Sequence, residues 1–206
     1  MSPLNVDAPG PMEDLLSWDI RTGEPIGMDA ALAETIKVLN VLRVRYVLIG
    51  TLALNLYVRP RFTSEISILC SANDLPEIRA SLSLDEYGNG RTAIDVKAAI
   101  SQAQRFALSQ SMPRAIFATG VLVASAMALL WLYLDGDGLQ DDVDAAQLIT
   151  FGCIEPTSVT ALLAASGSDD AITAWNRINA EIRYSRHIRL PAAAIDHQAR
   201  QKPAAR

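Results

Sequence analysis

Residues 46–70, YVLIGTLALNLYVRPRFTSEISILC, constrain the fold of this chain more than any other segment. They begin with the pattern of a buried strand at Tyr46–Ile49, and then reach Gly50, where a glycine allows a tight backbone turn. A short apolar helix is expected over residues 52–57, and a second strand over Glu65–Cys70.

The second strand carries polar residues at alternate positions. Side chains of a strand alternate between its two faces, so Glu65 and Ser67 are expected on the same face. An Arg-Pro-Arg turn formed by Arg59, Pro60 and Arg61 precedes the strand. A strand, a glycine turn, a helix and a basic turn followed by a polar strand face form a layout typical of a phosphate-handling site.

This segment resembles the nucleotidyltransferase fold, in the branch of minimal nucleotidyltransferases and AbiEii-like abortive-infection or toxin–antitoxin proteins. In that branch a strand leads to a glycine turn, an alanine-containing helix, Arg-x-Thr, and Asp-x-Asp on the next strand. The matching residues in this chain are Gly50, Ala53, Tyr57, Arg61 and Thr63.

Three features depart from the family pattern. Thr51 stands where the second glycine is expected, Val58 follows the tyrosine where a further glycine is expected, and Glu65-Ile66-Ser67 stands where Asp-x-Asp is expected. The resemblance implies that the Asp-x-Asp pair holds two divalent metal ions and that a third carboxylate, matched here by Asp95, comes from a later strand. One carboxylate is therefore lengthened and another replaced by a hydroxyl, which is a degraded catalytic motif.

The resemblance also assigns roles to the candidate residues. Glu65 and Asp95 are expected as residual catalytic and metal-binding residues, with Mg²⁺ and a nucleoside triphosphate as the implied cofactors. The residues expected to bind the nucleotide are Gly50, Thr51, Arg61 and Ser67.

Each of these assignments has a structural alternative. Glu65 and Asp95 are also read as solvent-edge acids whose charge is satisfied by Arg59 or Arg61. Gly50 with Thr51 is also read as a plain strand-to-helix turn, because a lone Gly-Thr pair is a weak phosphate signal.

The predicted fold class is α/β (α+β), with a mixed sheet flanked by helices and followed by a helical C-terminal part. We expect an extended or mobile segment over residues 1–28, the nucleotidyltransferase-like domain over 29–123, the helical part over 124–190 and a flexible basic tail over 191–206.

Further elements are predicted from periodicity and capping signals. Asp29 is expected to cap a helix over 30–42, and Asp74 a helix that ends near residue 82. Strands are expected over 92–96 and 115–123, and helices over 97–108, 126–134, 141–151, 158–165 and 171–188. A tight connection is expected at Gly88-Asn89-Gly90. The helix over 141–151 is expected to direct four side chains inward, those of Val143, Ala146, Leu148 and Ile149.

Residues 115–134 contain no charged side chain and would be long enough to span a bilayer as one helix. The preferred interpretation is a strand followed by a helix. Gly120 and several β-branched residues occupy the first half, and Ser125 is a good N-cap for the Ala/Leu-rich second half. A membrane-associated protein therefore remains the less favoured alternative.

An acidic segment follows this stretch, and it fails the calcium-loop pattern because residue twelve of the loop is Ala146 instead of a glutamate. Family relatives carry basic residues near an Asp-x-x-Asp pattern in this region. Here Asp141 and Asp144 remain, whereas Trp131 and Tyr133 occupy the preceding helix. This is a second departure from the family at a functional position.

Net charge and cysteine content limit the classes of binding partner and the cellular compartment that are expected for this chain. The formal net charge of −5 argues against a generally basic nucleic-acid binder. A protein partner or a homo-oligomer is expected, with RNA or an acidic partner as a further possibility through the basic stripe of Arg183, Arg186 and Arg189. Cys70 and Cys153 are expected as reduced core thiols, which suits a cytoplasmic protein.

These observations favour a catalytically impaired nucleotidyltransferase-like protein, which acts by binding a nucleotide or as a subunit of a protein assembly. One alternative is an active Mg²⁺-dependent NMP-transferase of the toxin–antitoxin type that uses Glu65 and Asp95. The other is a membrane-associated protein that inserts residues 115–134.

Overall fold

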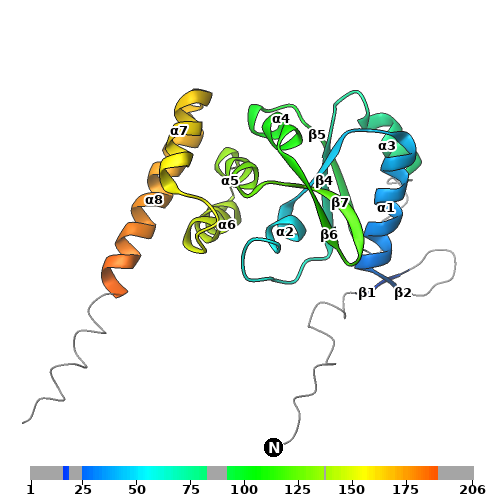
Figure 1. Ribbon diagram of the computed structural model, residues 1–206, viewed down its shortest axis with the longest axis horizontal. Coiled ribbons are helices and arrows are strands. Elements are labelled where there is room, and N and C mark those ends of the chain that lie inside the picture. Colours follow the sequence, from blue (N-terminus) through cyan, green and yellow to red (C-terminus); the bar gives the residue numbers. More distant parts are fainter. Residues whose placement is uncertain (1–15, 19–24, 83–91, 137, 190–206) are drawn as a thin grey trace, which may run out of the picture. The chain divides into compact units, whose positions relative to one another are not determined.

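The computed structural model describes residues 16–18, 25–82, 92–136 and 138–189 of the chain (Figure 1). Its contacts divide the chain into two compact units, Met1–Leu132 and Tyr133–Arg206. The predicted turn at Gly88-Asn89-Gly90 and the predicted tail lie outside the described residues.

The first unit is built on a five-stranded mixed sheet with strand order β5-β4-β3-β7-β6. Pairing is antiparallel for β3 with β4 and for β6 with β7, and parallel for β4 with β5 and for β3 with β7. These strands are β3 Tyr46–Ile49, β4 Glu65–Cys70, β5 Ala93–Ala98, β6 Ser111–Ile116 and β7 Thr119–Ala124. A separate antiparallel pair is formed by β1 Leu16–Trp18 and β2 Pro25–Gly27.

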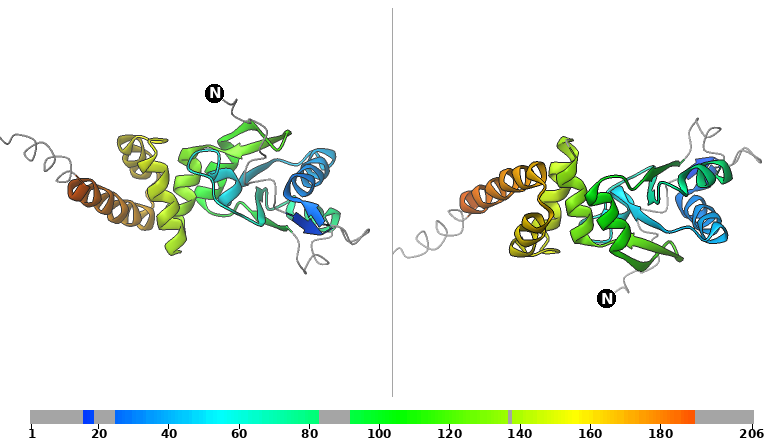
Figure 2. Two further views of the ribbon diagram at one scale, coloured as in Figure 1. Left: turned by 90° about the horizontal axis from the view of Figure 1, so that it is seen from below. Right: turned by 90° about the horizontal axis from the view of Figure 1, so that it is seen from above.

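Helices cover both faces of the five-stranded sheet. In Figures 1 and 2, α1 and α3 lie on one face, and α2 and α4 lie on the other. The central strand β3 is consequently enclosed, and Val47 and Leu48 have no solvent exposure. The predicted mixed sheet flanked by helices is therefore confirmed. The helices are α1 Met28–Leu42, α2 Gly50–Leu54, α3 Leu75–Ser81, α4 Gln102–Ser109 and α5 Ala126–Asp135.

The first helix has the predicted inner face but an earlier start. Leu32, Ile36 and Leu39 are all buried, as their helical spacing predicts. The N-cap position belongs to Gly27, so the expectation that Asp29 caps this helix was wrong. Asp29 lies instead in the first turn, where a carboxylate favourably meets the positive end of the helix dipole.

The boundaries around the polar strands also differ from prediction. The helix expected over residues 52–57 is α2, which begins at Gly50 and ends at Leu54. The helix expected from Lys97 begins only at Gln102, because β5 continues beside β4 as far as Ala98. A capping box fixes this later start: Ser101 Oγ accepts from the Gln104 amide at 3.2 Å, and Gln104 Oε1 accepts from the Ser101 amide at 2.9 Å.

The uncharged stretch at residues 115–134 folds as two strands and a helix. The single strand predicted over 115–123 was wrong, because β6 and β7 form a hairpin that turns at Phe117 and Ala118, with φ values of 48° and 65°. The helix α5 follows, and Ser125 Oγ accepts from the Ala128 amide at 3.2 Å, as expected of an N-cap. In the described part of the chain, no helix is both long and apolar enough to cross a membrane.

In the residues of the second unit that the structure describes, three further helices follow: α6 Leu139–Thr150, α7 Pro156–Ser166 and α8 Asp169–Arg189. The inner face of α6 includes Leu148 and Ile149 as predicted, and also Ala145. Val143 was predicted inward but is 50% exposed, whereas Asp144 is buried with 3% exposure. Ala146, also predicted inward, is only partly buried, so the predicted inner face is confirmed at Leu148 and Ile149 and wrong at Val143.

Candidate functional site

The two predicted carboxylates lie on neighbouring strands of the first unit. Strands β4 and β5 run parallel, and Ser67 is the register partner of Asp95. Register partners of parallel strands project to the same face at a spacing of about 4.8 Å. Glu65, Ser67, Asp95 and Lys97 therefore share one face of the sheet.

Ser67 is held against the first carboxylate. Its hydroxyl donates a hydrogen bond of 2.6 Å to Glu65 Oε1, and the serine is only 9% exposed. Ser67 is thus a neutral donor to the carboxylate of Glu65. This bond commits one oxygen of Glu65 to a protein partner.

The second carboxylate is held by a lysine. Lys97 Nζ lies 2.7 Å from Asp95 Oδ2, and the two side chains are 55% and 34% exposed, respectively. An ion pair this exposed contributes at most about 1 kcal/mol to stability, so its main consequence is local charge. The ammonium neutralises the carboxylate that the resemblance assigns to metal binding.

The glycine turn packs directly on Ser67. Gly50 has φ +69°, a conformation that glycine adopts without steric cost. A Cβ atom built on Gly50 would lie 3.0 Å from Ser67 Oγ and 3.1 Å from Ser67 Cβ. Glycine is thus required by both the backbone conformation and the close approach to the serine.

The basic turn is fixed to the same place by hydrogen bonds. Arg61 Nη2 donates to Thr51 Oγ1 at 3.2 Å, which directs the guanidinium to the start of α2. The side chain of Asn55 donates to the Arg61 carbonyl at 2.8 Å and accepts from the Arg61 amide at 3.1 Å. Tyr57 Oη donates to the Ala124 carbonyl at 2.9 Å, so the segment after α2 is also tied to the end of β7.

Contacts and strand register therefore join all the predicted site residues into one group. The group extends from the basic turn through the glycine turn to the two acids, and its members are Arg61, Thr51, Gly50, Ser67, Glu65 and Asp95. Sequence reasoning missed Lys97, because a helix was expected to start there, and Asn55, whose contact with Arg61 has no sequence signature.

The residues do not fit the pair of Mg²⁺ ions that the family resemblance implies. A two-ion site needs carboxylates that bridge and surround the ions, and Mg²⁺ prefers oxygen ligands in octahedral geometry. Here Ser67 supplies a hydroxyl in place of a carboxylate, and the carboxylate of Asp95 forms an ion pair with the ammonium of Lys97. Within the described ranges, no three or more His, Cys, Asp or Glu side chains are grouped so as to hold a metal ion.

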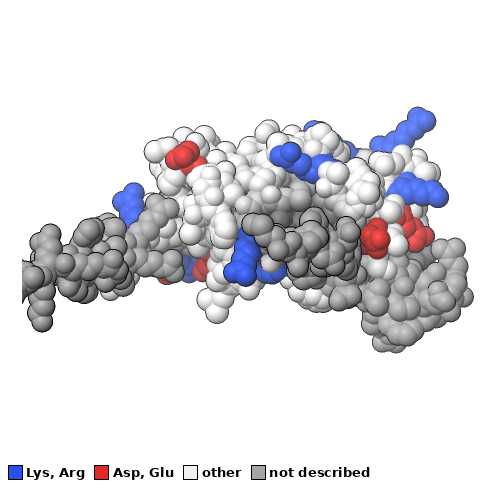
Figure 3. All heavy atoms as spheres, turned by 60° about the horizontal axis from the view of Figure 1, so that its bottom comes forward, with Lys and Arg blue, Asp and Glu red and all other residues white. Residues whose placement is uncertain are grey.

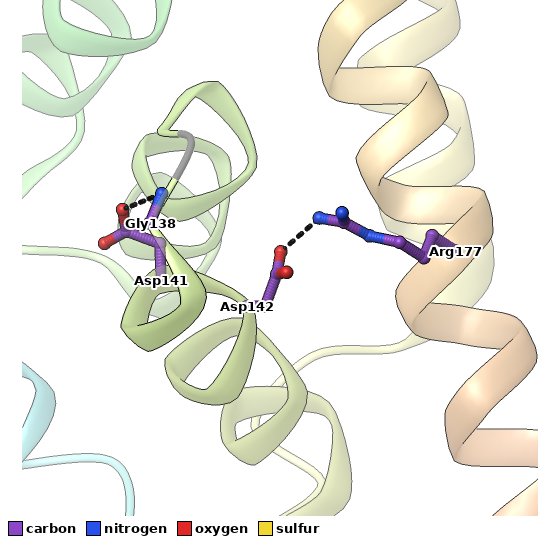
Figure 4. Close-up of polar contacts among 4 residues, drawn as sticks. All are labelled: Gly138, Asp141, Asp142 and Arg177. Carbon is purple, nitrogen blue, oxygen red and sulfur yellow. Dashed lines mark hydrogen bonds and ion pairs between the residues drawn. The ribbon is translucent and has the colours of Figure 1, made fainter.

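The acidic residues of the second unit have structural partners. Asp141 accepts from the Gly138 amide at 3.2 Å and so caps α6, and Asp142 pairs with Arg177 of α8 at 2.6 Å (Figure 4). The buried Asp144 accepts from Gln140 Nε2 at 2.8 Å. These contacts give Asp141 and Asp142 a role in the helical packing of this unit.

The basic residues of α8 and the two cysteines are the other predicted functional groups. Arg183 is exposed on α8, whereas the side chains of Arg186 and Arg189 lie outside the described part. Both cysteines are free thiols, but only Cys70 is buried and Cys153 is partly exposed. Burial raises the pKa of the Cys70 thiol to about 11, with Asp74 adding to the effect, so Cys70 is a neutral core thiol at physiological pH.

The described surface shows no broad field of one charge on the face drawn in Figure 3. Lys and Arg side chains lie there singly or in small groups, as do Asp and Glu side chains, between uncharged residues.

No family model matches the chain, and no curated protein sequence matches it. Among solved structures, the solution structure of the antibiotic-resistance factor ANT(2'')-Ia is similar, with 16% identity, a TM-score of 0.42, and coverage of 79% of this chain and 98% of that one. The crystal structure of ANT(2'')-Ia with adenylyl-2''-tobramycin is also similar, with 13% identity, a TM-score of 0.44, and coverage of 76% and 99%.

Proposed function

We propose that this chain is a nucleotidyltransferase-like protein of the AbiEii-like branch, with a degraded catalytic motif, that binds a nucleotide without efficient transfer. The observation that carries the proposal is the position of Ser67. It occupies the centre of the acidic group, contacts Gly50 and donates to Glu65. A nucleotide site is thus retained in outline, while the carboxylate that a two-ion transfer needs is replaced by a hydroxyl.

The phosphate-binding part of the site supports nucleotide binding. Thr51 brings a hydroxyl and Arg61 a guanidinium to the same turn. Guanidinium groups form strong charge-assisted hydrogen bonds with phosphate oxygens. Because Asn55 fixes the backbone of Arg61, the arginine is held in place before a ligand arrives.

Thermal-shift measurements with ATP, GTP, CTP and UTP test the binding directly. At least one nucleotide is expected to raise the melting temperature of the wild type. Arg61→Ala is expected to remove the shift, and Arg79→Ala, an exposed change on α3 at the opposite face of the sheet, is the matched control. The absence of a shift with all four nucleotides would contradict nucleotide binding.

A label-transfer assay separates this proposal from the active alternative. The wild type is incubated with radiolabelled nucleotides, Mg²⁺ or Mn²⁺, and total RNA or protein. The proposal predicts no transfer above background. Transfer that Asp95→Ala abolishes would establish the active alternative, a metal-dependent NMP-transferase.

A second role, as a subunit of a protein assembly, is supported by apolar side chains at the surface of α6 and just after it. Leu139 is 86% exposed, Val143 is 50% exposed and Phe151 is 55% exposed. Leu139 and Val143 are four residues apart and so lie on one side of the helix. Exposed apolar groups that share one side of a helix are typical of a protein–protein contact. Contact with RNA through Arg183, Arg186 and Arg189 stays a prediction.

A further inference from the structure

We infer that Lys97 takes the electrostatic place of a metal ion, so that the site binds the phosphates of a nucleoside triphosphate without a divalent cation. The inference rests on the proposed nucleotide binding and adds to it the way in which the phosphate charge is met. Lys97 is not part of the motif that the sequence resemblance assigns.

The position of Lys97 carries the first step. It follows Asp95 by two residues on β5 and projects to the same face as Asp95 and Ser67. Its ammonium lies 2.7 Å from Asp95 Oδ2, on the carboxylate that would otherwise bind an ion. A positive charge therefore lies on the carboxylate that the sequence resemblance assigns to metal binding.

The charge balance of the group carries the second step. Among the residues that contacts and strand register join into this group, two are carboxylates, Glu65 and Asp95, and two are cations, Arg61 and Lys97, so the formal charges of these four side chains sum to zero. Sites with an excess of carboxylates repel a triphosphate unless metal ions are bound, because like charges interact unfavourably. A neutral site does not require this compensation. An additional divalent cation would instead meet the ammonium of Lys97 at close range.

Hydrogen-bonding capacity carries the third step. An ammonium group has three donor protons, so one lysine can bond a carboxylate and a phosphate oxygen at the same time. Thr51 Oγ1 accepts from Arg61 and so keeps its own proton for a phosphate oxygen, whereas the hydroxyl proton of Ser67 is donated to Glu65. Lys97 and Arg61 thus supply charge, and the Thr51 hydroxyl supplies a further contact for phosphate oxygens.

Isothermal titration calorimetry of the full chain tests the inference. ATP, GTP, CTP and UTP are titrated separately into the wild type with EDTA and with saturating Mg²⁺. For the tightest nucleotide, the dissociation constants in the two buffers are expected to agree within about threefold, because the protein itself supplies the cation. Binding that requires Mg²⁺ would overturn the inference and leave the proposed nucleotide binding intact. No binding in either buffer would contradict both.

Three variants assign the effect to Lys97. Lys97→Met is expected to weaken metal-free binding by about tenfold, the loss typical of one charge-assisted hydrogen bond, and Lys97→Arg to restore most of it. Lys37→Met makes the same chemical change on α1, at the opposite face of the sheet, and is expected to leave binding unchanged. If Lys97→Met folds, as judged by circular dichroism, and binds like the wild type, Lys97 does not have this role.

Asp95→Asn provides a second, independent outcome. The inference predicts that this variant binds the nucleotide in EDTA as tightly as the wild type or more tightly, because it removes a negative charge and leaves the ammonium in place. A metal site predicts the opposite, because Asp95 would then be a ligand. If Asp95→Asn binds the nucleotide more weakly than the wild type does, in EDTA or in Mg²⁺, the inference is overturned.

Discussion

At the scale of single residues, Gly50 shows how closely the turn and the polar strand are fitted. Its φ of +69° and its approach to Ser67 both exclude a side chain. Gly50→Ala is expected to lower the free energy of unfolding by about 2 kcal/mol, from backbone strain together with the displacement of Ser67. Urea unfolding followed by circular dichroism measures this change.

Gly120→Ala is the control for that experiment. Gly120 lies in β7, and a Cβ atom there would meet no atom within 4 Å. This variant is expected to stay within about 0.5 kcal/mol of the wild type. Equal effects of the two substitutions would show that the turn at Gly50 is not packed as described.

Asn55 positions the basic turn through both of its amide atoms. Asn55→Ala removes the bonds to the Arg61 amide and carbonyl and is expected to destabilise the chain by about 2 kcal/mol, because two backbone groups lose their partner. It should also weaken nucleotide binding, since the guanidinium of Arg61 is no longer fixed. Thermal shift with and without nucleotide reports both effects, and Asn73→Ala, an exposed position after β4, is the control. A variant as stable as the wild type would contradict this role.

The sequence supplied the acids of the site but not their partners. Glu65 and Ser67 were predicted on one face from strand alternation, and Asp95 was placed from the family resemblance. The pairing of Asp95 with Lys97 follows from the length of β5, which depends on its parallel partner β4 and not on local residues. The length of β5 is thus set by a long-range strand pairing, which local periodicity in the sequence does not report.

At the scale of elements, the cap of α5 was predictable and carries a measurable share of stability. Ser125 Oγ accepts from the Ala128 amide at the start of this helix. Ser125→Ala is expected to cost about 1 kcal/mol, whereas Ser125→Asp should retain most of the stability, because aspartate caps equally well. Urea unfolding measures both.

Ser109→Ala tests whether any serine at a helix end has the same effect. The Ser109 hydroxyl donates to the Phe106 carbonyl at the exposed end of α4. Its removal is expected to change stability by less than about 0.5 kcal/mol. A loss at Ser109 as large as that at Ser125 would argue against a specific capping effect.

The turn between β6 and β7 was not predictable from the sequence pattern. Its turn consists of Phe117 and Ala118, which lack the glycine, asparagine or proline that usually mark a turn. Both residues adopt positive φ because the hairpin register requires it. Residues 115–123 were therefore predicted as one strand, although the order of a strand followed by a helix was predicted correctly.

At the scale of the whole molecule, the apolar side of α6 determines whether the protein acts alone. Replacing both Leu139 and Val143 by glutamate is expected to dissociate an oligomer or a partner complex without unfolding, since both side chains are at least half exposed. Size-exclusion chromatography with light scattering measures the mass. Asn176→Glu, an exposed change on α8, controls for added charge. A wild type that is monomeric and captures no partner would remove the basis for an assembly role.

The most direct test of the central claim is a nucleotide titration followed by nitrogen–proton correlation NMR on the full chain. The account predicts that the largest amide shifts occur at Gly50, Thr51, Ser67 and Asp95, which the structure joins into one group. Shifts confined to other parts of the chain, or none with any of the four nucleoside triphosphates, would contradict a retained nucleotide site at this face of the sheet.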